Sequence, residues 1–378
     1  MGVSVRQAFG IFVLFTFAVL CSPPARLEAQ EPAPQTATPQ AVSPQTTIQY
    51  PKPVPMGSSC GNWQSAPFIY TGTCGLRVRF FDVPDVHAIL SNNHVLGAQG
   101  PLLCPNTATP KQTITLQPGT LDIGSIPADP SPYAVGLFVG SQPINFSVGA
   151  SNLIDAALSY TTPAHADSTI LNLGQPTQGF IAPAPGMTVT KTGRTTNTTV
   201  GTIQAVNTTV LVNYGTDCGT ARFVSQVIIA GTGGSFSAGG DSGSAILESS
   251  TKVPVGLLFA GSPTQTVAND IRIVYFLFRV LPDGTAPTGA TAQALQRMPT
   301  TYSPEVERVS AVKSRVESSF FRNADVVGVG VGQGEAGGTA IIVYTRGTPS
   351  ITAQALPQLV EGVPVRVVHS GGFDAYRW

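Results

Sequence analysis

The chain has 378 residues, only 11% of them charged, and a formal net charge of zero. This balance argues against a nucleic-acid partner, which requires a basic surface. The 40 glycines and 32 prolines, together with a scarcity of long helical patterns, favour short strands joined by turns. The composition therefore predicts a mainly β fold.

The N-terminus is typical of an exported protein. Arg6 precedes an apolar run over residues 8–20, which is too short to span a bilayer comfortably. We expect a signal peptide over residues 1–29, with cleavage near Ala25 or Ala29. The protein is then secreted or periplasmic, and no integral membrane segment is expected after the signal is removed.

The cysteines predict disulfide bonds. Cys21 raises a lipid anchor as an alternative, but Leu20 before it is larger than the residue that such processing usually requires. The other four form an even set in an exported chain, with three possible connectivities. No Cys-x-x-Cys pair occurs, and no histidine lies at ligand spacing from a cysteine, so no metal site is expected. These four are Cys60, Cys74, Cys104 and Cys218.

A disordered linker and a hairpin are predicted before the first candidate site residue. Residues 30–56 are rich in Pro, Gln, Thr and Ala, a composition that cannot bury a core. From Cys60 the composition of the sequence changes, and residues 74–81 and 86–91 predict the two strands of a hairpin. The second strand runs into His94, which therefore lies at a strand end, where an imidazole can project into a cleft.

Asp155 is the one carboxylate in the apolar run over residues 152–160. Burying a lone carboxylate costs several kcal/mol unless it is hydrogen-bonded. Asp155 is therefore expected to have a role, and orienting an imidazole is such a role; capping a turn is the alternative. Asp122 is the second candidate, although its Pro- and Gly-rich setting is typical of an ordinary loop residue.

Ser242 lies in a glycine-rich turn within a second set of predicted strands, over residues 186–281. Glycines permit positive φ and let backbone N–H groups converge, as a nucleophilic serine requires. A plain turn between two strands is the alternative. His94 and Asp155 thus fall in one β-rich half and Ser242 in the other. This is the arrangement expected of a two-barrel hydrolase with its active site in the cleft.

Three motifs resemble those of the chymotrypsin-like (trypsin-fold) serine proteases, specifically a bacterial secreted branch. Residues 91–94 are similar to the family's strand-end histidine motif, residues 155–158 to its aspartate motif and residues 240–244 to its nucleophile motif. The order His, Asp, Ser is that of this fold among hydrolases that use the same three residues. The resemblance covers residues 57–285 and implies two six-stranded antiparallel β-barrels.

The resemblance also implies roles for residues outside these motifs. Arg194 would pair with Asp241 and replace the buried N-terminus of the animal enzymes; a surface charge on a turn is the alternative. A strand beside the first specificity pocket would pair with the substrate backbone. Its residues are Phe259, Ala260 and Gly261.

The resemblance further implies a disulfide pairing and reveals departures from the family pattern. A bridge between Cys74 and Cys104 would close the loop around the histidine and leave Cys60 with Cys218. The family usually has Cys or Gly directly after the histidine, where this chain has Val95. It usually has Gly-Pro after the glycine that follows the nucleophile, where this chain has Ser and Ala.

The implied reaction is that of an exported serine endopeptidase acting on a polypeptide. His94 would take the proton from Ser242, and Asp155 would fix the imidazole tautomer. The backbone N–H groups of Gly240 and Ser242 would form the oxyanion hole. Neither a metal nor an organic cofactor is needed. A non-catalytic binding or scaffold protein on the same fold is the main alternative, and an esterase is a lesser one.

The C-terminal part is predicted to be a linker, residues 286–302, followed by a small α/β module, residues 303–378. Glycine-rich residues 328–334 superficially resemble a nucleotide loop, but a hairpin turn follows rather than a helix, so phosphate binding is not expected. The module could bind substrate, aid folding or place the C-terminus over the cleft as an inhibitor, and the sequence leaves these open. The predicted elements are a helix from Pro304, strands at 325–331, 339–344 and 363–369, and a short helix at 351–356.

Overall fold

The computed structural model describes residues 44–63, 71–97, 104–335, 337–347 and 356–376. The predicted signal peptide and residues 30–43 of the predicted linker over residues 30–56 lie outside these ranges. Within them, no helix has both the length and the apolar character needed to cross a membrane.

The first sheet is antiparallel and has eight strands. Its members are β2 (Ser59–Asn62), β3 (Gly72–Thr73), β4 (Leu76–Phe80), β5 (His87–Ser91), β6 (Ile114–Leu116), β7 (Ala134–Ser141), β8 (Ala157–Thr161) and β16 (Val280–Pro282). They are ordered β16-β4-β5-β8-β7-β6-β2-β3. Alternation along β4 buries Leu76 and Val78 and leaves the residues between and after them partly exposed.

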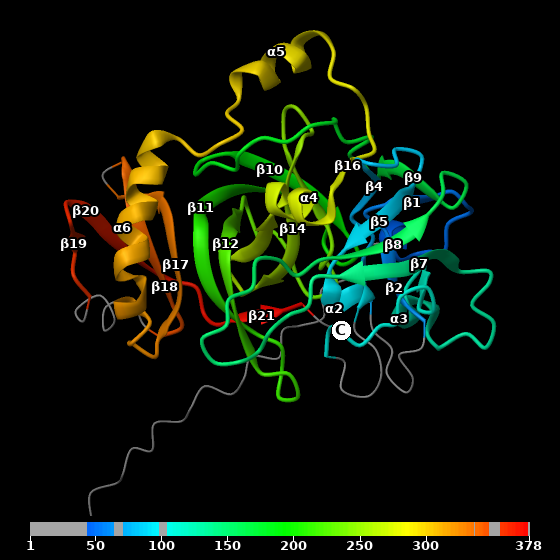
Figure 1. Ribbon diagram of the computed structural model, residues 1–378, viewed down its shortest axis with the longest axis horizontal. Coiled ribbons are helices and arrows are strands. Elements are labelled where there is room, and N and C mark those ends of the chain that lie inside the picture. Colours follow the sequence, from blue (N-terminus) through cyan, green and yellow to red (C-terminus); the bar gives the residue numbers. More distant parts are fainter. Residues whose placement is uncertain (1–43, 64–70, 98–103, 336, 348–355, 377–378) are drawn as a thin grey trace, which may run out of the picture. The chain divides into compact units, whose positions relative to one another are not determined.

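The second sheet contains a closed ring (Figure 1). Its strands pair in the order β10-β13-β14-β15-β12-β11, and β10 also pairs with β11, which closes the ring. They are β10 (Thr188–Gly193), β11 (Asn197–Asn213), β12 (Thr220–Gly231), β13 (Ala245–Glu248), β14 (Pro254–Gly261) and β15 (Thr266–Asp270).

The mainly β class is confirmed, whereas two closed six-stranded barrels are not. In the first sheet, the terminal strands β16 and β3 each pair with a single neighbour among the described residues. The strand β3 spans only two residues, Gly72–Thr73, and therefore offers few backbone groups for a second ladder. As far as the structure describes it, the first half of the fold is thus an open sheet.

The C-terminal strands continue the sheet of the ring. The strand β17 pairs with β11, which makes the sheet eleven-stranded, and α6 packs against β17 and β18. The predicted helix at 351–356 lies outside the described residues except for Leu356. The elements are α6 (Pro304–Phe320), β17 (Val326–Gln333), β18 (Thr339–Thr345), β19 (Leu359–Val360), β20 (Val363–His369) and β21 (Phe373–Ala375).

The remaining elements are short. The predicted linker over residues 286–302 contains a helix, α5, none of whose residues is buried. The strands β1 and β9 pair in parallel. These elements are α1 (Pro44–Thr47), β1 (Val54–Met56), α2 (Asn93–Leu96), α3 (Thr120–Ile123), β9 (Ala166–Ile170), α4 (Ile271–Phe278) and α5 (Gly289–Arg297).

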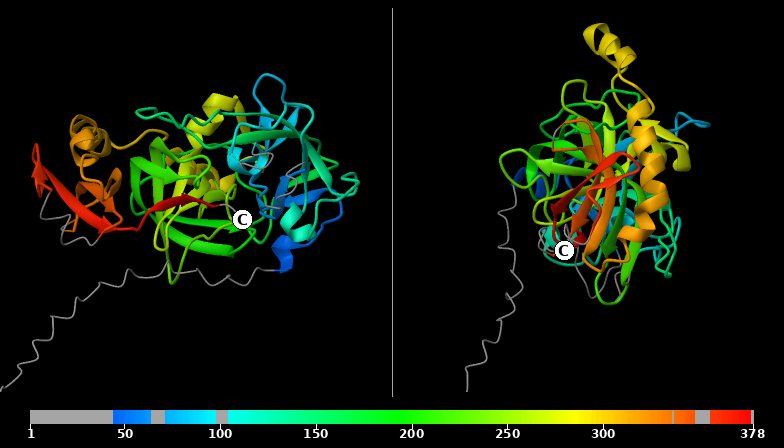
Figure 2. Two further views of the ribbon diagram at one scale, coloured as in Figure 1. Left: turned by 90° about the horizontal axis from the view of Figure 1, so that it is seen from below. Right: turned by 90° about the vertical axis from the view of Figure 1, so that its left-hand side faces the viewer.

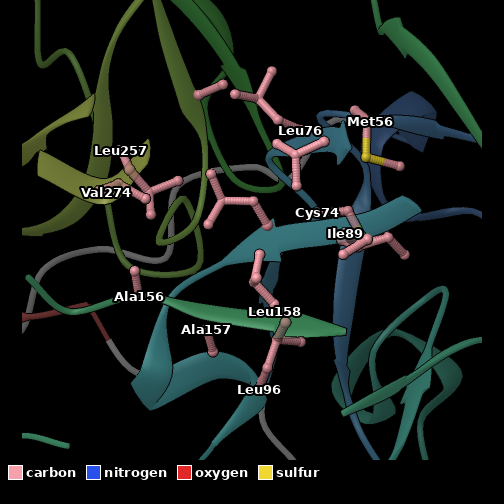
Figure 3. Packing of buried hydrophobic residues seen from close by; sticks show 14 of the residues in the cluster. Met56, Cys74, Leu76, Ile89, Leu96, Ala156, Ala157, Leu158, Leu257 and Val274 are labelled. Atoms are coloured by element: carbon pink, nitrogen blue, oxygen red, sulfur yellow. The ribbon is translucent and has the colours of Figure 1, made fainter. Parts of the chain in front are cut away.

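One hydrophobic cluster joins the two sheets (Figure 3). Leu76, Ile89 and Leu158 come from the first sheet, whereas Leu257 comes from β14 and Val274 from α4. Each is fully buried or nearly so, and burying such a side chain contributes about 1.5–3 kcal/mol. The cluster therefore holds the His94 half of the chain against the Ser242 half.

Candidate active site

His94 lies in α2, the single helical turn that follows β5. The strand β5 is paired on both sides, with β4 and β8, so the position at which the chain leaves the sheet is well defined. The His94 side chain is buried, and its Nδ1 lies 2.5 Å from Asp155 Oδ2. The His94 backbone N–H also donates to Asp155 Oδ1, at 3.2 Å. The structure thus brings two of the predicted site residues into direct contact.

Every polar group of Asp155 has a partner. Its carboxylate accepts a further hydrogen bond, 2.6 Å long, from the Tyr214 hydroxyl. Its backbone N–H donates to Asn269 Oδ1 at 2.9 Å, and its carbonyl accepts from Nδ2 of Asn92 and of Asn269. A buried carboxylate with this many donors avoids the penalty of an unsatisfied charge. The orientation of His94 is therefore fixed from both halves of the chain.

Tyr214 and Asn269 are site residues that sequence reasoning missed. Asn269 was detectable by the signal that marked Asp155, because it is a polar residue that follows apolar residues in a buried strand, β15. Tyr214 carried no such signal. It directly follows β11, and only the folded arrangement places its hydroxyl on a carboxylate 59 residues earlier in the chain.

The Ser242 turn packs tightly against the segment that carries His94. The Ser242 carbonyl accepts a hydrogen bond from the Thr73 N–H, at 2.7 Å. A Cβ atom on Gly72 would lie 2.4 Å from the Val95 side chain and 2.8 Å from the Ser242 carbonyl oxygen. Only glycine allows this approach, so Gly72 lets the residue after His94 and the serine turn share one contact point.

The Ser242 hydroxyl is within hydrogen-bond distance of two carbonyl oxygens. They belong to Phe259, at 3.2 Å, and to Tyr376, at 3.1 Å. His94 Nε2 is buried and has no hydrogen-bond partner among the described residues. The serine and the imidazole therefore lie on neighbouring segments without a hydrogen bond between them.

Asp241, the residue before the serine, is held by a lysine. Lys191 Nζ lies 3.4 Å from Asp241 Oδ2, and both side chains are fully buried. The carboxylate also accepts from the backbone N–H groups of Thr195 and Thr196, at 2.8 and 3.1 Å. Burial lowers the pKa of Lys191, and the Asp241 carboxylate offsets part of this shift. These contacts fix the shape of the turn that carries Ser242.

The expected pairing of Arg194 with Asp241 is wrong. The Arg194 guanidinium binds Asp122 instead, through Nε at 3.0 Å and Nη2 at 2.5 Å. The turn that begins at Arg194 points its backbone N–H groups at Asp241, while its side chain extends to α3, where Asp122 lies. Asp122 is therefore neither a free loop residue nor a partner of His94.

The disulfide pairing that the family resemblance implied is also wrong. The structure joins Cys104 to Cys218 and leaves Cys60 and Cys74 as buried thiols. Cys60 belongs to β2 and Cys74 directly follows β3, the strand paired with β2, so these two thiols are neighbours in the interior. Burial, together with the neighbouring Cys74, raises the pKa of the Cys60 thiol. The bridge instead ties the segment after α2 to the loop after Tyr214.

The predicted substrate strand is paired with the chain's own C-terminal strand. In β14, Ala260 lies opposite Ala375 and Gly261 opposite Asp374, in antiparallel register. The Phe259 carbonyl accepts both from the Ser242 hydroxyl and from the Tyr376 N–H, at 3.3 Å. The residues Phe259, Ala260 and Gly261 therefore already bind an extended segment.

No family model matches the chain, and no curated protein matches it. A glutamic-acid-specific serine protease of known structure matches 61% of this chain and 100% of its own, with 20% identity and a TM-score of 0.41. Protease A of Thermobifida fusca matches 61% of this chain and 99% of its own, with 18% identity and a TM-score of 0.41. The Cellulomonas bogoriensis chymotrypsin matches 57% of this chain and 96% of its own, with 18% identity and a TM-score of 0.37. All three of these solved structures are proteases, and each match covers about 60% of this chain.

Proposed function

We propose that the protein is a serine endopeptidase that cleaves peptide bonds through Ser242, His94 and Asp155. One observation carries this proposal. The imidazole of His94 is buried, and its Nδ1 is hydrogen-bonded to the Asp155 carboxylate. Its Nε2 has no hydrogen-bond partner among the described residues. Leaving a buried polar atom unpaired costs about 1–3 kcal/mol. A functional reason for that cost is that Nε2 accepts a proton during a reaction.

The contacts of Asp155 support a general base at His94. With the Nδ1 proton donated to Asp155, the neutral imidazole has its lone pair on Nε2. When Ser242 Oγ attacks a peptide carbonyl, its proton passes to Nε2, and Asp155 stabilises the imidazolium that results. The leaving amine takes that proton, and water then hydrolyses the acyl-enzyme by the same steps. The Ser242 hydroxyl must first rotate away from the two carbonyl oxygens.

The glycine turn supports an oxyanion site. Gly240 and Gly243 have φ angles of 87° and 94°, a conformation that favours glycine. Lys191 and two backbone N–H groups hold Asp241 between them, so the N–H groups of Gly240 and Ser242 keep their direction. Losing one donor of such a site typically costs about 3 kcal/mol of transition-state stabilisation.

The pairing capacity of β14 favours a polypeptide substrate over a small ester. Residues 259–261 accept an extended strand through backbone hydrogen bonds, as β21 demonstrates. A peptide chain can add to this position by the same ladder. A small ester lacks the repeated amide groups that such a ladder requires.

Labelling with a fluorophosphonate, followed by mass spectrometry of the labelled peptide, tests the proposal. We expect the label on Ser242, hydrolysis of casein by the chain, and loss of both in Ser242→Ala. The loss of activity should be at least about 10⁴-fold, with an unchanged melting temperature. Ser235→Ala is the matched control, because Ser235 is exposed and lies before the glycine turn. A non-catalytic binding protein would take no label and hydrolyse nothing in any variant.

A further inference from the structure

The C-terminal segment over residues 373–376 lies in the place where the proposed function puts a substrate. Figures 1 and 2 show β21, in red, running from the C-terminal strands to the strands of the ring. It pairs antiparallel with β14, and the Tyr376 N–H donates to the Phe259 carbonyl at 3.3 Å. The Tyr376 carbonyl oxygen lies 3.1 Å from Ser242 Oγ. Tyr376 therefore occupies the position of the residue on the acyl side of a scissile bond.

The Tyr376 side chain enters a slot beside the nucleophile. Its hydroxyl lies 3.3 Å from Ser237 Oγ and 3.5 Å from the Ser262 carbonyl oxygen. A Cβ atom on Gly261 would lie 2.0 Å from that hydroxyl and 2.4 Å from the ring carbon that bears it. Any side chain at 261 would thus close the slot. Its polar contacts are uncharged, which suits an aromatic side chain with a hydrogen-bonding end.

The C-terminal segment over residues 373–376 is anchored in the core by its first residue. Phe373 is buried, stacks edge-on against Tyr344 with ring centroids 6.1 Å apart, and lies opposite Val212 of β11. An anchored segment acts at an effective concentration of about millimolar, so even weak contacts at Tyr376 keep the site occupied.

The contacts at Ser242 are those of an occupant that blocks the reaction. The serine hydroxyl is within hydrogen-bond distance of the carbonyl oxygens of Phe259 and Tyr376. His94 Nε2 has no hydrogen-bond partner among the described residues. In a reactive arrangement the hydroxyl would instead donate to Nε2. The bound segment thus gives the serine proton another acceptor.

We propose that residues 373–376 are a substrate-like inhibitor in cis. The intact chain then works at a tenth or less of the rate of the freed site, which prefers substrates with tyrosine or phenylalanine on the acyl side of the cleaved bond. This inference rests on the proposed function of the same site.

The test compares the full chain with a chain that ends at Ala375. The shortened chain keeps Phe373 in the core and loses only residues 376–378. We expect its rate of fluorophosphonate labelling, and its kcat/KM on a peptide amide with tyrosine at the acyl position, to rise tenfold or more. A chain that ends at Tyr376 is the matched control and should keep the low rates of the full chain. The shortened chain should cleave the tyrosine amide at least tenfold faster than the matched lysine or glutamate amide.

Equal rates for the full and shortened chains would overturn the inhibition, and a preference for lysine or glutamate would overturn the specificity. A failure of the proposed function is distinguishable, because Ser242 would then stay unlabelled in every chain. In that case, the binding of a fluorescent peptide with the sequence of residues 371–376 tests whether the C-terminal segment occupies the site. Binding to the shortened chain and not to the full chain supports the occupancy. Equal binding to both chains, or to neither, overturns it.

Discussion

The two sides of the site differ in how firmly they are built. On the histidine side, Asp155 is hydrogen-bonded to His94 and, from the second half of the chain, to Tyr214 and Asn269. On the serine side, the Ser242 hydroxyl donates its hydrogen bond to either of two carbonyl oxygens, one of which belongs to Tyr376. The orientation of His94, the proposed general base, is thus held by the folded core, whereas Ser242, the proposed nucleophile, has a partner in Tyr376 that can leave. Control of the reaction is therefore expected on the serine side.

The largest effect on the histidine side is expected for Asp155→Asn. An amide has a single acceptor oxygen, so it cannot accept from the His94 backbone N–H on one side and from His94 Nδ1 and Tyr214 on the other. The imidazole therefore loses its tautomer and orientation. We expect kcat/KM to fall by about 10⁴-fold, close to 5 kcal/mol, with the fold retained by circular dichroism. Asp85→Asn, at an exposed position, is the control. A loss below tenfold would remove the difference between the two sides, because the histidine side would then not depend on its carboxylate.

Lys191→Met is expected to destabilise the serine side by about 3–5 kcal/mol in the free energy of unfolding. It leaves the buried Asp241 carboxylate without its cation, and an uncompensated buried charge carries a penalty of this size. Urea unfolding of the variant measures it. Arg279→Met is the matched comparison, since it breaks an arginine–aspartate pair, with Asp82, that is exposed. If the two variants lost the same stability, burial of the Asp241 carboxylate would not carry the expected penalty.

Tyr214→Phe is expected to have the smallest effect. It removes one hydrogen bond to a charged group, worth about 1.5–3 kcal/mol, and leaves the ring packing in place. We expect kcat/KM to fall roughly tenfold to a hundredfold, mostly through kcat. Tyr344→Phe is the control, because the buried Tyr344 hydroxyl has no hydrogen-bond partner among the described residues. Equal losses in the two variants would show that Tyr214 acts through packing alone.

Local patterns were sufficient to predict three candidate residues of the site, His94, Asp155 and Ser242. A histidine at a strand end, a carboxylate in an apolar run and a serine among glycines each carry their signal within a few neighbours. The structure places His94 against Asp155 and packs the Ser242 turn on the adjoining segment.

Side-chain direction over long separations could not be predicted. Arg194 and Lys191 are three residues apart, and which of them reaches Asp241 depends on where the strand β10 ends and the turn begins. The partner of Cys104 lies 114 residues away, in a loop whose position depends on the closed ring. The pairing of β21 with β14 likewise brings Tyr376 to a serine 134 residues earlier in the chain. Such contacts arise from tertiary packing, which leaves no local pattern.

The pairing of β17 with β11 has a consequence for how the chain can be divided. β17 covers the backbone of β11 from Ala205 to Val210, a largely buried stretch. Without it, a row of unpaired N–H and C=O groups on this otherwise buried stretch would be open to a second molecule, and such exposed edges promote aggregation. A fragment cut after residue 302 is therefore expected to self-associate through β11. The C-terminal strands protect the solubility of the ring, whatever they do for its activity.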